Sequence, residues 1–287
     1  MSSTIAIVGA GRVGRALARS LRARGWTIGT VITRSFGTAR SAVRAIGGGH
    51  PYGDVTRRVL DADVVLIATP DDAVREVAAK LARAGGEEWR GKIVLHTSGA
   101  LDGRVLQPLA RAGAAIGAMH PLQTFSGRGA PELEGVVFVI EGDRRAQKAA
   151  RRIAHALGGA PVTLRSAVKP AYHAAATFAA PYVLVLIESA MRILMRAGFR
   201  RQRAKLALLP LIRQTLANYE RLGARRSWTG PVARGDYSTV ARHRAALAEW
   251  PEEFSQSYAA LARLSARVLD AHPERKLKQL DRVLPKR

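Results

Sequence analysis

The first 165 residues alternate between short apolar runs and longer segments with one apolar face. The apolar runs predict strands at residues 5–8, 26–32, 63–70, 92–96, 114–118, 135–140 and 161–164. Between several of them, apolar positions three and four residues apart predict helices, as at 36–46 and 144–157. Strands that alternate with helices are typical of an α/β domain, in which helices cover both faces of a mostly parallel sheet.

After residue 165 the strand pattern stops. Alanine and leucine at helical spacing predict helices over 169–198, 200–222, 236–247 and 251–269, and we expect the charged tail from His272 to be frayed. The glycines at 47–49, followed by His50-Pro51, predict an irregular turn. The sequence therefore predicts two domains, an α/β domain over 1–165 and an all-α domain over 166–287.

The first predicted strand runs directly into a glycine motif, Gly9-Ala10-Gly11-Arg12-Val13-Gly14. In a Gly-x-Gly-x-x-Gly turn between strand and helix, the first glycine permits the tight turn, the second lets the backbone approach a pyrophosphate, and the third lets the helix pack on the strand. The helix N-terminus then offers free amides and a positive dipole to the phosphates. We therefore expect a Rossmann-like dinucleotide site made by all six residues of this motif.

The end of the second predicted strand indicates which dinucleotide is bound. NAD-preferring sites place Asp or Glu there to bond the ribose 2′-hydroxyl, whereas this chain has Thr33-Arg34-Ser35. The planar cation of Arg34, flanked by two hydroxyls, suits a 2′-phosphate, so NADP is the expected cofactor. The alternative is that Arg34 is a solvated loop residue in an arginine-rich protein.

Composition limits the possible partners. The formal charge is +24, but only eight of the 46 basic residues are lysine, and the arginines are spread over nearly every helix without a nucleic-acid motif or an aromatic platform. We therefore expect no nucleic-acid partner, and we expect the charge to attract a small anionic substrate. The absence of cysteine excludes disulfides and thiolate metal sites, and no metal is expected. With no basic-then-apolar leader, we expect a cytoplasmic protein.

The longest apolar stretch, Phe178–Met195, is interrupted by Pro181, Glu188 and Arg192. We therefore expect a buried or interfacial helix rather than a membrane span. A partner helix is the usual cover for such a surface, which predicts a homodimer formed through the helical domain.

Chemistry-bearing side chains follow several of the predicted strands, where ligands bind in open α/β sheets. The segments are Thr69-Pro70-Asp71-Asp72, His96-Thr97-Ser98-Gly99-Ala100, His120-Pro121-Leu122-Gln123 and the start of the long helix at Lys169-Pro170-Ala171-Tyr172-His173. Lys169 and His173 lie four residues apart, on one helix face, and either could protonate a substrate atom as hydride arrives. The alternatives are a surface lysine, a packing histidine, and loop-fixing roles for His96 and His120.

These motifs, together with Thr229-Gly230-Pro231-Val232-Ala233-Arg234-Gly235-Asp236, give the chain a family resemblance. It resembles bacterial Rossmann-like proteins with an all-helical C-terminal domain of unknown function, often labelled NADP oxidoreductases. Those proteins are similar to pyrroline-5-carboxylate reductases, 3-hydroxyacid dehydrogenases and the 6-phosphogluconate dehydrogenase-like group. Lys169 matches the lysine that opens the long helix in the hydroxyacid dehydrogenases, although His173 stands where they have asparagine, and Pro181 stands where similar proteins have asparagine.

The resemblance implies dimerisation through the helical domain and an active site between the domains. We expect an NADP-dependent oxidoreductase that transfers hydride between nicotinamide and a small, anionic C=O or C=N compound. Lys169 and His173 are the expected acid or orienting pair, His120 and Ser98 the next candidates, and Thr69-Pro70 part of the cofactor site. The alternative is an NADP-binding regulatory or scaffold dimer without turnover.

Overall fold

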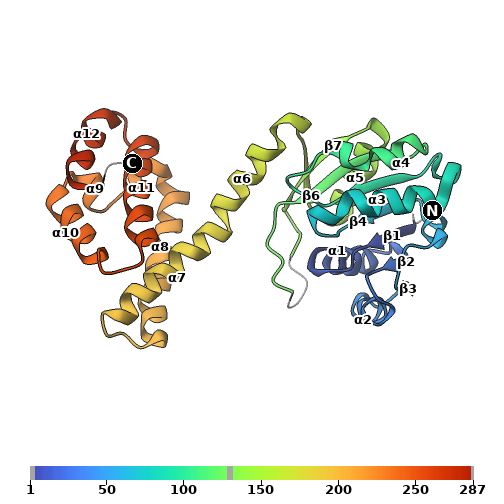
Figure 1. Ribbon diagram of the computed structural model, residues 1–287, viewed down its shortest axis with the longest axis horizontal. Coiled ribbons are helices and arrows are strands. Elements are labelled where there is room, and N and C mark those ends of the chain that lie inside the picture. Colours follow the sequence, from blue (N-terminus) through green and yellow to red (C-terminus); the bar gives the residue numbers. More distant parts are fainter. Residues whose placement is uncertain (1–3, 128–131, 286–287) are drawn as a thin grey trace. The chain divides into compact units, whose positions relative to one another are not determined.

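The computed structural model describes residues 4–127 and 132–285. An eight-stranded sheet within these residues has the order β3-β2-β1-β4-β5-β6-β7-β8, and Figure 1 shows it in blue to green with its helices. The β6–β7 pair is antiparallel and the other neighbours are parallel. The strands are β1 (Thr4–Val8), β2 (Thr27–Ile32), β3 (His50–Tyr52), β4 (Val64–Ile67), β5 (Ile93–His96), β6 (Ala115–Pro121), β7 (Val137–Gly142) and β8 (Ala160–Thr163).

The helices of this part of the chain connect successive strands. They are α1 (Arg12–Ala23), α2 (Phe36–Ile46), α3 (Asp71–Gly85), α4 (Gln107–Arg111) and α5 (Arg144–Ala156), with short 3-10 helices at Arg57–Asp61, Gly86–Trp89, Gly103–Leu106 and Ser166–Val168. The predicted α/β class with a mostly parallel sheet is confirmed.

The sheet separates two hydrophobic cores, because the apolar strand residues alternate between its faces. One core packs α1, α2 and α5 against side chains such as Ile5 and Ile7. The other packs α3 and α4 against side chains such as Ala6 and Val8. Burial on both faces explains why these strands read as continuous apolar runs in the sequence.

The described residues of the C-terminal part form helices joined by short loops, and none of them lies in a strand, as predicted. Its elements are α6 (Lys169–Ala179), α7 (Pro181–Arg196), α8 (Arg201–Ser227), α9 (Pro231–Arg234), α10 (Tyr237–Leu247), α11 (Glu252–Leu269) and α12 (Pro273–Val283), the later ones in orange and red in Figure 1.

Three local predictions were wrong. The tail is not frayed, because α12 buries Leu277 and Leu280 in a core shared with α9, α10 and α11. The predicted helix 169–198 is divided at Ala180, whose backbone (φ −125°, ψ −76°) leaves the helical region just before Pro181. The turn predicted around His50-Pro51 contributes the short edge strand β3, which pairs with β2.

The internal contacts of the chain divide it into two compact units, 1–181 and 182–287. The first contains the sheet and α6, and the second contains α7 to α12. The domain boundary predicted between 165 and 166 lies between β8 and α6 and stays a prediction.

The helix-rich segment Ser166–Arg196 is the one stretch of the described residues long and apolar enough to cross a membrane, judged by length and composition alone. An 18-residue window within it has a mean hydropathy of 1.6, and 6% of that window is buried. On α7, Leu184 is 66% exposed and Val185 57% exposed. These apolar side chains of α7 are therefore exposed in the single chain.

Candidate functional site

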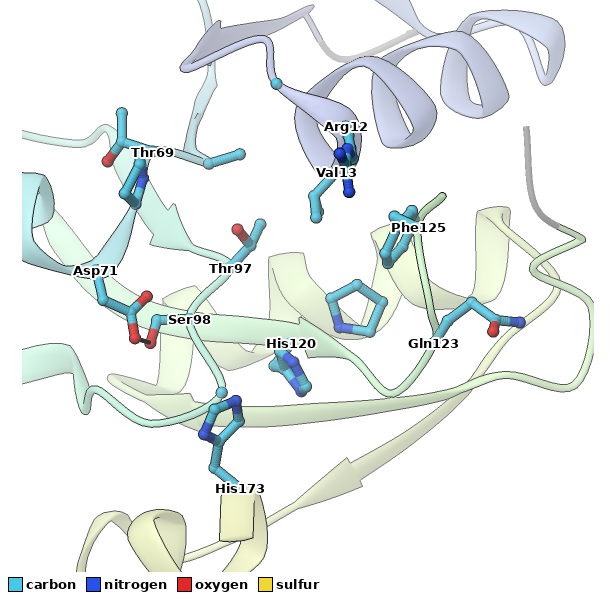
Figure 2. Close-up of a pocket in the computed structure, with 15 residues that line it drawn as sticks. Arg12, Val13, Thr69, Asp71, Thr97, Ser98, His120, Gln123, Phe125 and His173 are labelled. Atoms are coloured by element: carbon cyan, nitrogen blue, oxygen red, sulfur yellow. Dashed lines mark hydrogen bonds between the residues drawn. The ribbon is translucent and has the colours of Figure 1, made fainter. Parts of the chain in front are cut away.

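A cleft of about 420 Å³ lies at the carboxyl edge of the sheet, in the unit that contains the sheet (Figure 2). Four strand ends contribute to it, namely those of β1, β4, β5 and β6, as expected for ligand sites in open α/β folds. The start of α6 adds one further side chain. The lining residues are Gly11, Arg12, Val13, Ala68, Thr69, Pro70, Asp71, Thr97, Ser98, Gly99, His120, Pro121, Gln123, Phe125 and His173.

The glycines of the predicted dinucleotide motif have distinct physical roles. Gly9 has φ +90°, and a Cβ there would lie 2.7 Å from the Thr69 amide nitrogen. A Cβ on Gly14 would lie 2.3 Å from the Gly9 carbonyl oxygen, so glycine is required for α1 to pack this closely. A Cβ on Gly11 would meet nothing within 4 Å, and no side chain caps the helix that starts beside it. Gly11 therefore leaves its backbone and the first amides of α1 open to a ligand.

The Thr69 hydroxyl has no hydrogen-bond partner although its oxygen is buried. Thr69 follows β4 and lines the cleft, as does Pro70, which directly precedes α3. A buried hydroxyl without a partner is costly, so its position beside the cleft suits a ligand that bonds to it.

The Thr33-Arg34-Ser35 segment lies at the end of β2 and outside the lining of the cleft. The Thr33 hydroxyl donates to the Ser35 carbonyl (2.9 Å), and the Ser35 hydroxyl caps α2 by accepting from the Thr38 amide (3.3 Å). The two hydroxyls thus shape the turn, while the Arg34 side chain is exposed.

Ser98 has its hydroxyl fully engaged. Its Oγ donates to Asp71 Oδ2 (2.9 Å) and accepts from the amides of Ala100 (3.2 Å) and Leu101 (3.0 Å), as Figure 2 shows for the Asp71 contact. The one hydroxyl hydrogen is committed to Asp71. Ser98 therefore joins the loop after β5 to the start of α3.

Two histidines face each other across Gly99. The rings of His120 and His173 have centroids 6.0 Å apart at 81°, and both point into the cleft in Figure 2. A Cβ on Gly99 would lie 2.6 Å from His173 Cδ2 and 2.9 Å from His120 Nε2. Only glycine fits between these rings without displacing one of them.

His120 is held by a tyrosine of the same helix turn as His173. Its Nδ1 lies 2.7 Å from the Tyr172 hydroxyl, with the rings edge-on at 5.6 Å. Burial lowers the pKa of His120 to about 4, helped by the nearby His173 and the positive charge of Lys169. Burial also raises the pKa of Tyr172 to about 12. Both groups are therefore neutral at physiological pH.

Lys169 lies under the loop after β5 and does not line the cleft. Its side chain is buried and its Nζ donates to the Ser98 carbonyl oxygen (3.1 Å). Burial lowers the pKa of Lys169, while the negative charges of Glu141, Asp102 and Asp71 oppose that shift. The lysine thus braces the loop that carries Ser98.

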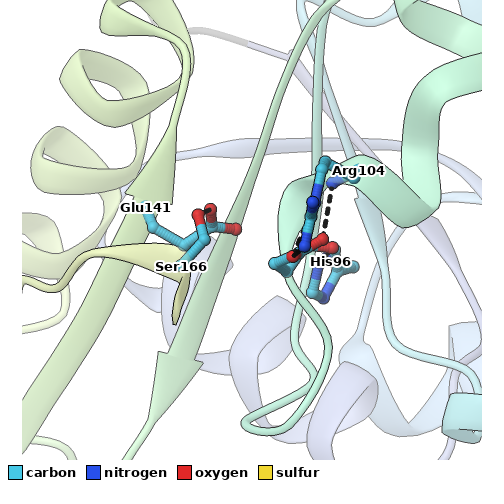
Figure 3. A network of polar contacts seen from close by, with 5 residues as sticks. His96, Arg104, Glu141 and Ser166 are labelled. Carbon is cyan, nitrogen blue, oxygen red and sulfur yellow. Dashed lines mark hydrogen bonds and ion pairs between the residues drawn. The ribbon is translucent and has the colours of Figure 1, made fainter. Parts of the chain in front are cut away.

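Glu141 on β7 is the carboxylate whose charge acts most strongly on Lys169. It is 4% exposed, its Oε2 accepts from the Ser166 hydroxyl (2.7 Å), and its Oε1 has no partner. Figure 3 shows Glu141 and Ser166 on one side and the His96 network on the other.

His96 fixes the same loop from its own strand end. The Ser98 amide donates to His96 Nδ1 (3.2 Å), so the proton sits on Nε2, which donates to the Asp102 carbonyl (3.2 Å). Burial, with the positive charge of Lys169, lowers the pKa of His96 to about 3. The side-chain bonds from Arg104 hold the pKa of the Asp102 carboxyl below its usual range. Of the alternatives for His96, the loop-fixing one describes its contacts.

The structure therefore gathers part of the predicted set. Of the predicted catalytic residues, Ser98, His120 and His173 line the cleft and Lys169 lies beneath it. Of the predicted cofactor residues, Gly11, Arg12, Val13, Thr69 and Pro70 line it, whereas Gly9, Ala10 and Gly14 shape the turn behind it. The Thr229–Asp236 motif lies in the helical unit, where Asp236 caps α10 by accepting from the Thr239 amide (3.0 Å).

Sequence reasoning did not single out Asp71, Gly99, Phe125, Glu141 or Tyr172 as site residues. Asp71 and Gly99 stand in the strand-end segments and Tyr172 in the segment that opens the long helix, so the carboxyl-edge rule and that segment were usable signals for them. Nothing in the sequence pattern separates Glu141, in the antiparallel strand, from an ordinary surface glutamate.

Two domain models match the chain. Residues 2–121 match the Rossmann-like domain, and residues 136–265 match the domain of unknown function DUF2520. The chain therefore joins a Rossmann-like domain to a DUF2520 domain. The resemblance to Rossmann-like proteins with a helical C-terminal domain of unknown function is confirmed, and no curated protein matches the sequence.

Solved structures share the fold of this Rossmann-like/DUF2520 chain over almost its whole length. BF3122 from Bacteroides fragilis, for which an NADP oxidoreductase function has been suggested, is 22% identical with a TM-score of 0.77, covering 92% of this chain and 98% of that one. Protein TM1727 from Thermotoga maritima is 24% identical with a TM-score of 0.69, covering 93% and 98%. An imine reductase from Myxococcus stipitatus in complex with NADP⁺ is 17% identical with a TM-score of 0.68, covering 98% and 99%.

Proposed function

We propose that this protein is an NADP-dependent oxidoreductase acting on a small C=O or C=N compound. The observation that carries the proposal is the cleft itself, where the dinucleotide turn and the histidine pair line one cavity. Structural neighbours include an imine reductase in complex with NADP⁺, which supports this reaction class. When bound, NADPH supplies a hydride to the carbon of the C=O or C=N bond and becomes NADP⁺, while a proton is added to the oxygen or nitrogen.

The residues present fit a dinucleotide. Gly11 offers open space where a Cβ would stand, the α1 N-terminus has no side-chain cap, and the buried Thr69 hydroxyl lacks a partner. A pyrophosphate at this turn would accept from the amides of α1. Arg34, with Thr33 and Ser35 shaping its turn, would hold the 2′-phosphate of NADP.

The chain's own residues would orient the substrate and supply hydrogen bonds. His120 and His173 face the cleft and would contact the reacting oxygen or nitrogen. We propose that Ser98 and Lys169 do not contact the substrate but hold the loop after β5 in place. The Ser98 hydroxyl is bonded to Asp71, and the Lys169 ammonium is bonded to the Ser98 carbonyl oxygen. They would keep Gly99 close to both histidine rings.

The substrate's negative charge is a proposal drawn from the strongly basic composition. Among the cleft-lining residues in the described ranges, Arg12 is the single arginine or lysine, and it would be the first candidate to meet an anionic group. The contribution of the helical half to the substrate site, the cytoplasmic location and the homodimer also stay predictions.

Calorimetry and a turnover screen test the proposal. We expect NADPH to bind more tightly than NADH, and NADPH absorbance to fall when keto acids or imines of small size are added. Binding of NADPH without turnover on any of them would favour the regulatory or scaffold alternative. If the protein binds neither NADPH nor NADH, the proposal is overturned.

Arg34 is the residue that should set the cofactor preference. Arg34→Ala removes a charge-assisted contact of about 1.5–3 kcal/mol, so NADPH affinity should fall by about ten- to a hundredfold while NADH affinity changes little. Arg44→Ala, on the exposed side of α2, removes the same charge and is the matched control. Equal affinity of the unmodified protein for both cofactors would contradict this role.

A further inference from the structure

The cleft contains one histidine whose proton position is set by a neighbour. His120 Nδ1 lies 2.7 Å from the Tyr172 hydroxyl, so only Nε2 remains for a ligand. Nε2 lies on the Gly99 side, 2.9 Å from where a Cβ on residue 99 would stand. Because residue 99 is glycine, this nitrogen keeps access to the cleft.

The chemistry of the pair decides which atom donates. An imidazole nitrogen is a better acceptor than a phenol oxygen, and a phenol O–H is a better donor than an imidazole N–H. Tyr172 has one hydroxyl hydrogen, and among the described residues His120 Nδ1 lies within hydrogen-bond distance to accept it. The favoured arrangement is therefore O–H···Nδ1, which leaves the ring proton of neutral His120 on Nε2.

We propose that Tyr172 is a positioning residue that fixes His120 as an Nε2–H donor directed into the cleft. The matching ligand is a molecule whose reacting atom is a hydrogen-bond acceptor, such as a carbonyl oxygen or an imine nitrogen. This inference rests on the proposed function for the identity of the ligand, but the tautomer itself does not. It assigns a role to a residue that neither the sequence motifs nor the dinucleotide site requires.

The neutral state of the His120 ring determines which kind of ligand it can bind. A histidine buried with a low pKa cannot attract a carboxylate by charge, but it can polarise a neutral acceptor through Nε2–H, as fixed dipoles do in other active sites. Ser98 cannot compete for this role, since its hydroxyl hydrogen goes to Asp71. Of these two cleft residues, His120 is thus the one with a hydrogen left to donate to a ligand.

The chain contains a matched control for this arrangement. In the helical unit, His243 Nδ1 lies 2.9 Å from the Tyr258 hydroxyl, with ring centroids 5.8 Å apart at 81°. This pair has nearly the geometry of His120 and Tyr172, but it belongs to the other unit of the chain. Tyr258→Phe therefore removes the same kind of bond without touching the cleft described above.

The test uses long-range ¹H–¹⁵N spectra of the full-length labelled protein at pH 7.5, with the His120 signals assigned from His120→Gln. We expect the unmodified protein to show a single Nε2–H tautomer of His120 with Nδ1 as a hydrogen-bonded acceptor. Tyr172→Phe should lower the ratio of Nε2–H to Nδ1–H by about fivefold, the value of one hydrogen bond. Tyr258→Phe should change the His243 signals and leave those of His120 in place.

A kinetic readout follows the same variants with NADPH and two probes, pyruvate as a carbonyl and 1-pyrroline as an imine. Tyr172→Phe should lower kcat by about fivefold or more and leave NADPH affinity unchanged, whereas Tyr258→Phe should do neither. A proton on Nδ1 in the unmodified protein, or unchanged His120 signals in Tyr172→Phe, would overturn the inference. Absence of turnover in the unmodified protein counts against the proposed function alone, because the spectra decide the tautomer independently.

Discussion

At the scale of single residues, burial around the cleft holds two histidines neutral. The pKa of His120 is lowered to about 4 and that of His96 to about 3, mainly by burial. Both rings bind fewer protons in the folded state than in the unfolded state between their folded pKa and about 6.5. Their contribution to stability is therefore complete above pH 6.5 and is lost as the pH falls through this window.

We expect the free energy of unfolding to fall by about 2 kcal/mol for each of these histidines between pH 7 and pH 5. Urea titrations at both pH values measure it. His120→Gln should remove about half of the histidine-dependent loss, and His155→Gln, an exposed position on α5, should remove none. Equal pH dependence in all three proteins would contradict the assignment.

Lys169 on α6 and Glu141 on β7 are two buried ionisable residues of the same unit. Burial lowers the pKa of Lys169, and the charge of Glu141 is the largest influence that opposes this shift. We expect a double-mutant cycle with Lys169→Met and Glu141→Gln to give a coupling of about 1–3 kcal/mol in urea unfolding. Additive effects of the two substitutions would show that the charges act independently.

At the scale of elements, two glycines of the Gly9–Gly14 turn have different roles. Gly14 lets α1 pack against the turn, and Gly11 leaves space for the cofactor. Gly14→Ala places a methyl group 2.3 Å from the Gly9 carbonyl, so α1 must move away from β1. We expect this variant to lose about 1–3 kcal/mol of stability, as overpacked sites do, together with NADPH binding.

Gly11→Ala is its matched counterpart, since nothing lies within 4 Å of the added methyl group. Here we expect the melting temperature to stay nearly unchanged while NADPH affinity falls at least about tenfold, because the methyl occupies the space of the phosphates. Thermal melts and calorimetry on both variants separate the two effects. Intact NADPH binding in Gly11→Ala would contradict a phosphate site at this turn.

At the scale of the whole molecule, the apolar surface of α7 predicts self-association. Leu184 and Val185 are more than half exposed in the single chain, a surface usually covered in solution. We expect light scattering to report a homodimer at micromolar concentration and Leu184→Asp to shift it toward monomer. Phe36→Asp, at a similarly exposed apolar position on α2, should leave the dimer intact. A monomeric unmodified protein would contradict the prediction.

The sequence by itself determined the fold class, because the spacing of apolar residues along the chain is sufficient to predict alternating strands and helices. Apolar strands alternate with amphipathic helices, and the Gly9–Gly14 motif marks a turn where sterics require glycine at Gly9 and Gly14 and a ligand would require it at Gly11. The carboxyl-edge rule then placed Thr69, Ser98 and His120 along one cleft. These inferences depend on local pattern and on chain order, which the sequence states directly.

Only the tertiary structure decided what the side chains do. In the folded chain, Lys169 donates to the Ser98 carbonyl oxygen and the Ser98 hydroxyl donates to Asp71. Tyr172 bonds to His120, which lies 52 positions away along the chain. The tertiary structure also packed α12, where charge along the sequence predicted fraying, because Leu277 and Leu280 complete a core built by other helices. Such roles depend on burial and on partners from distant segments, and neither is visible in the spacing of residues along one chain.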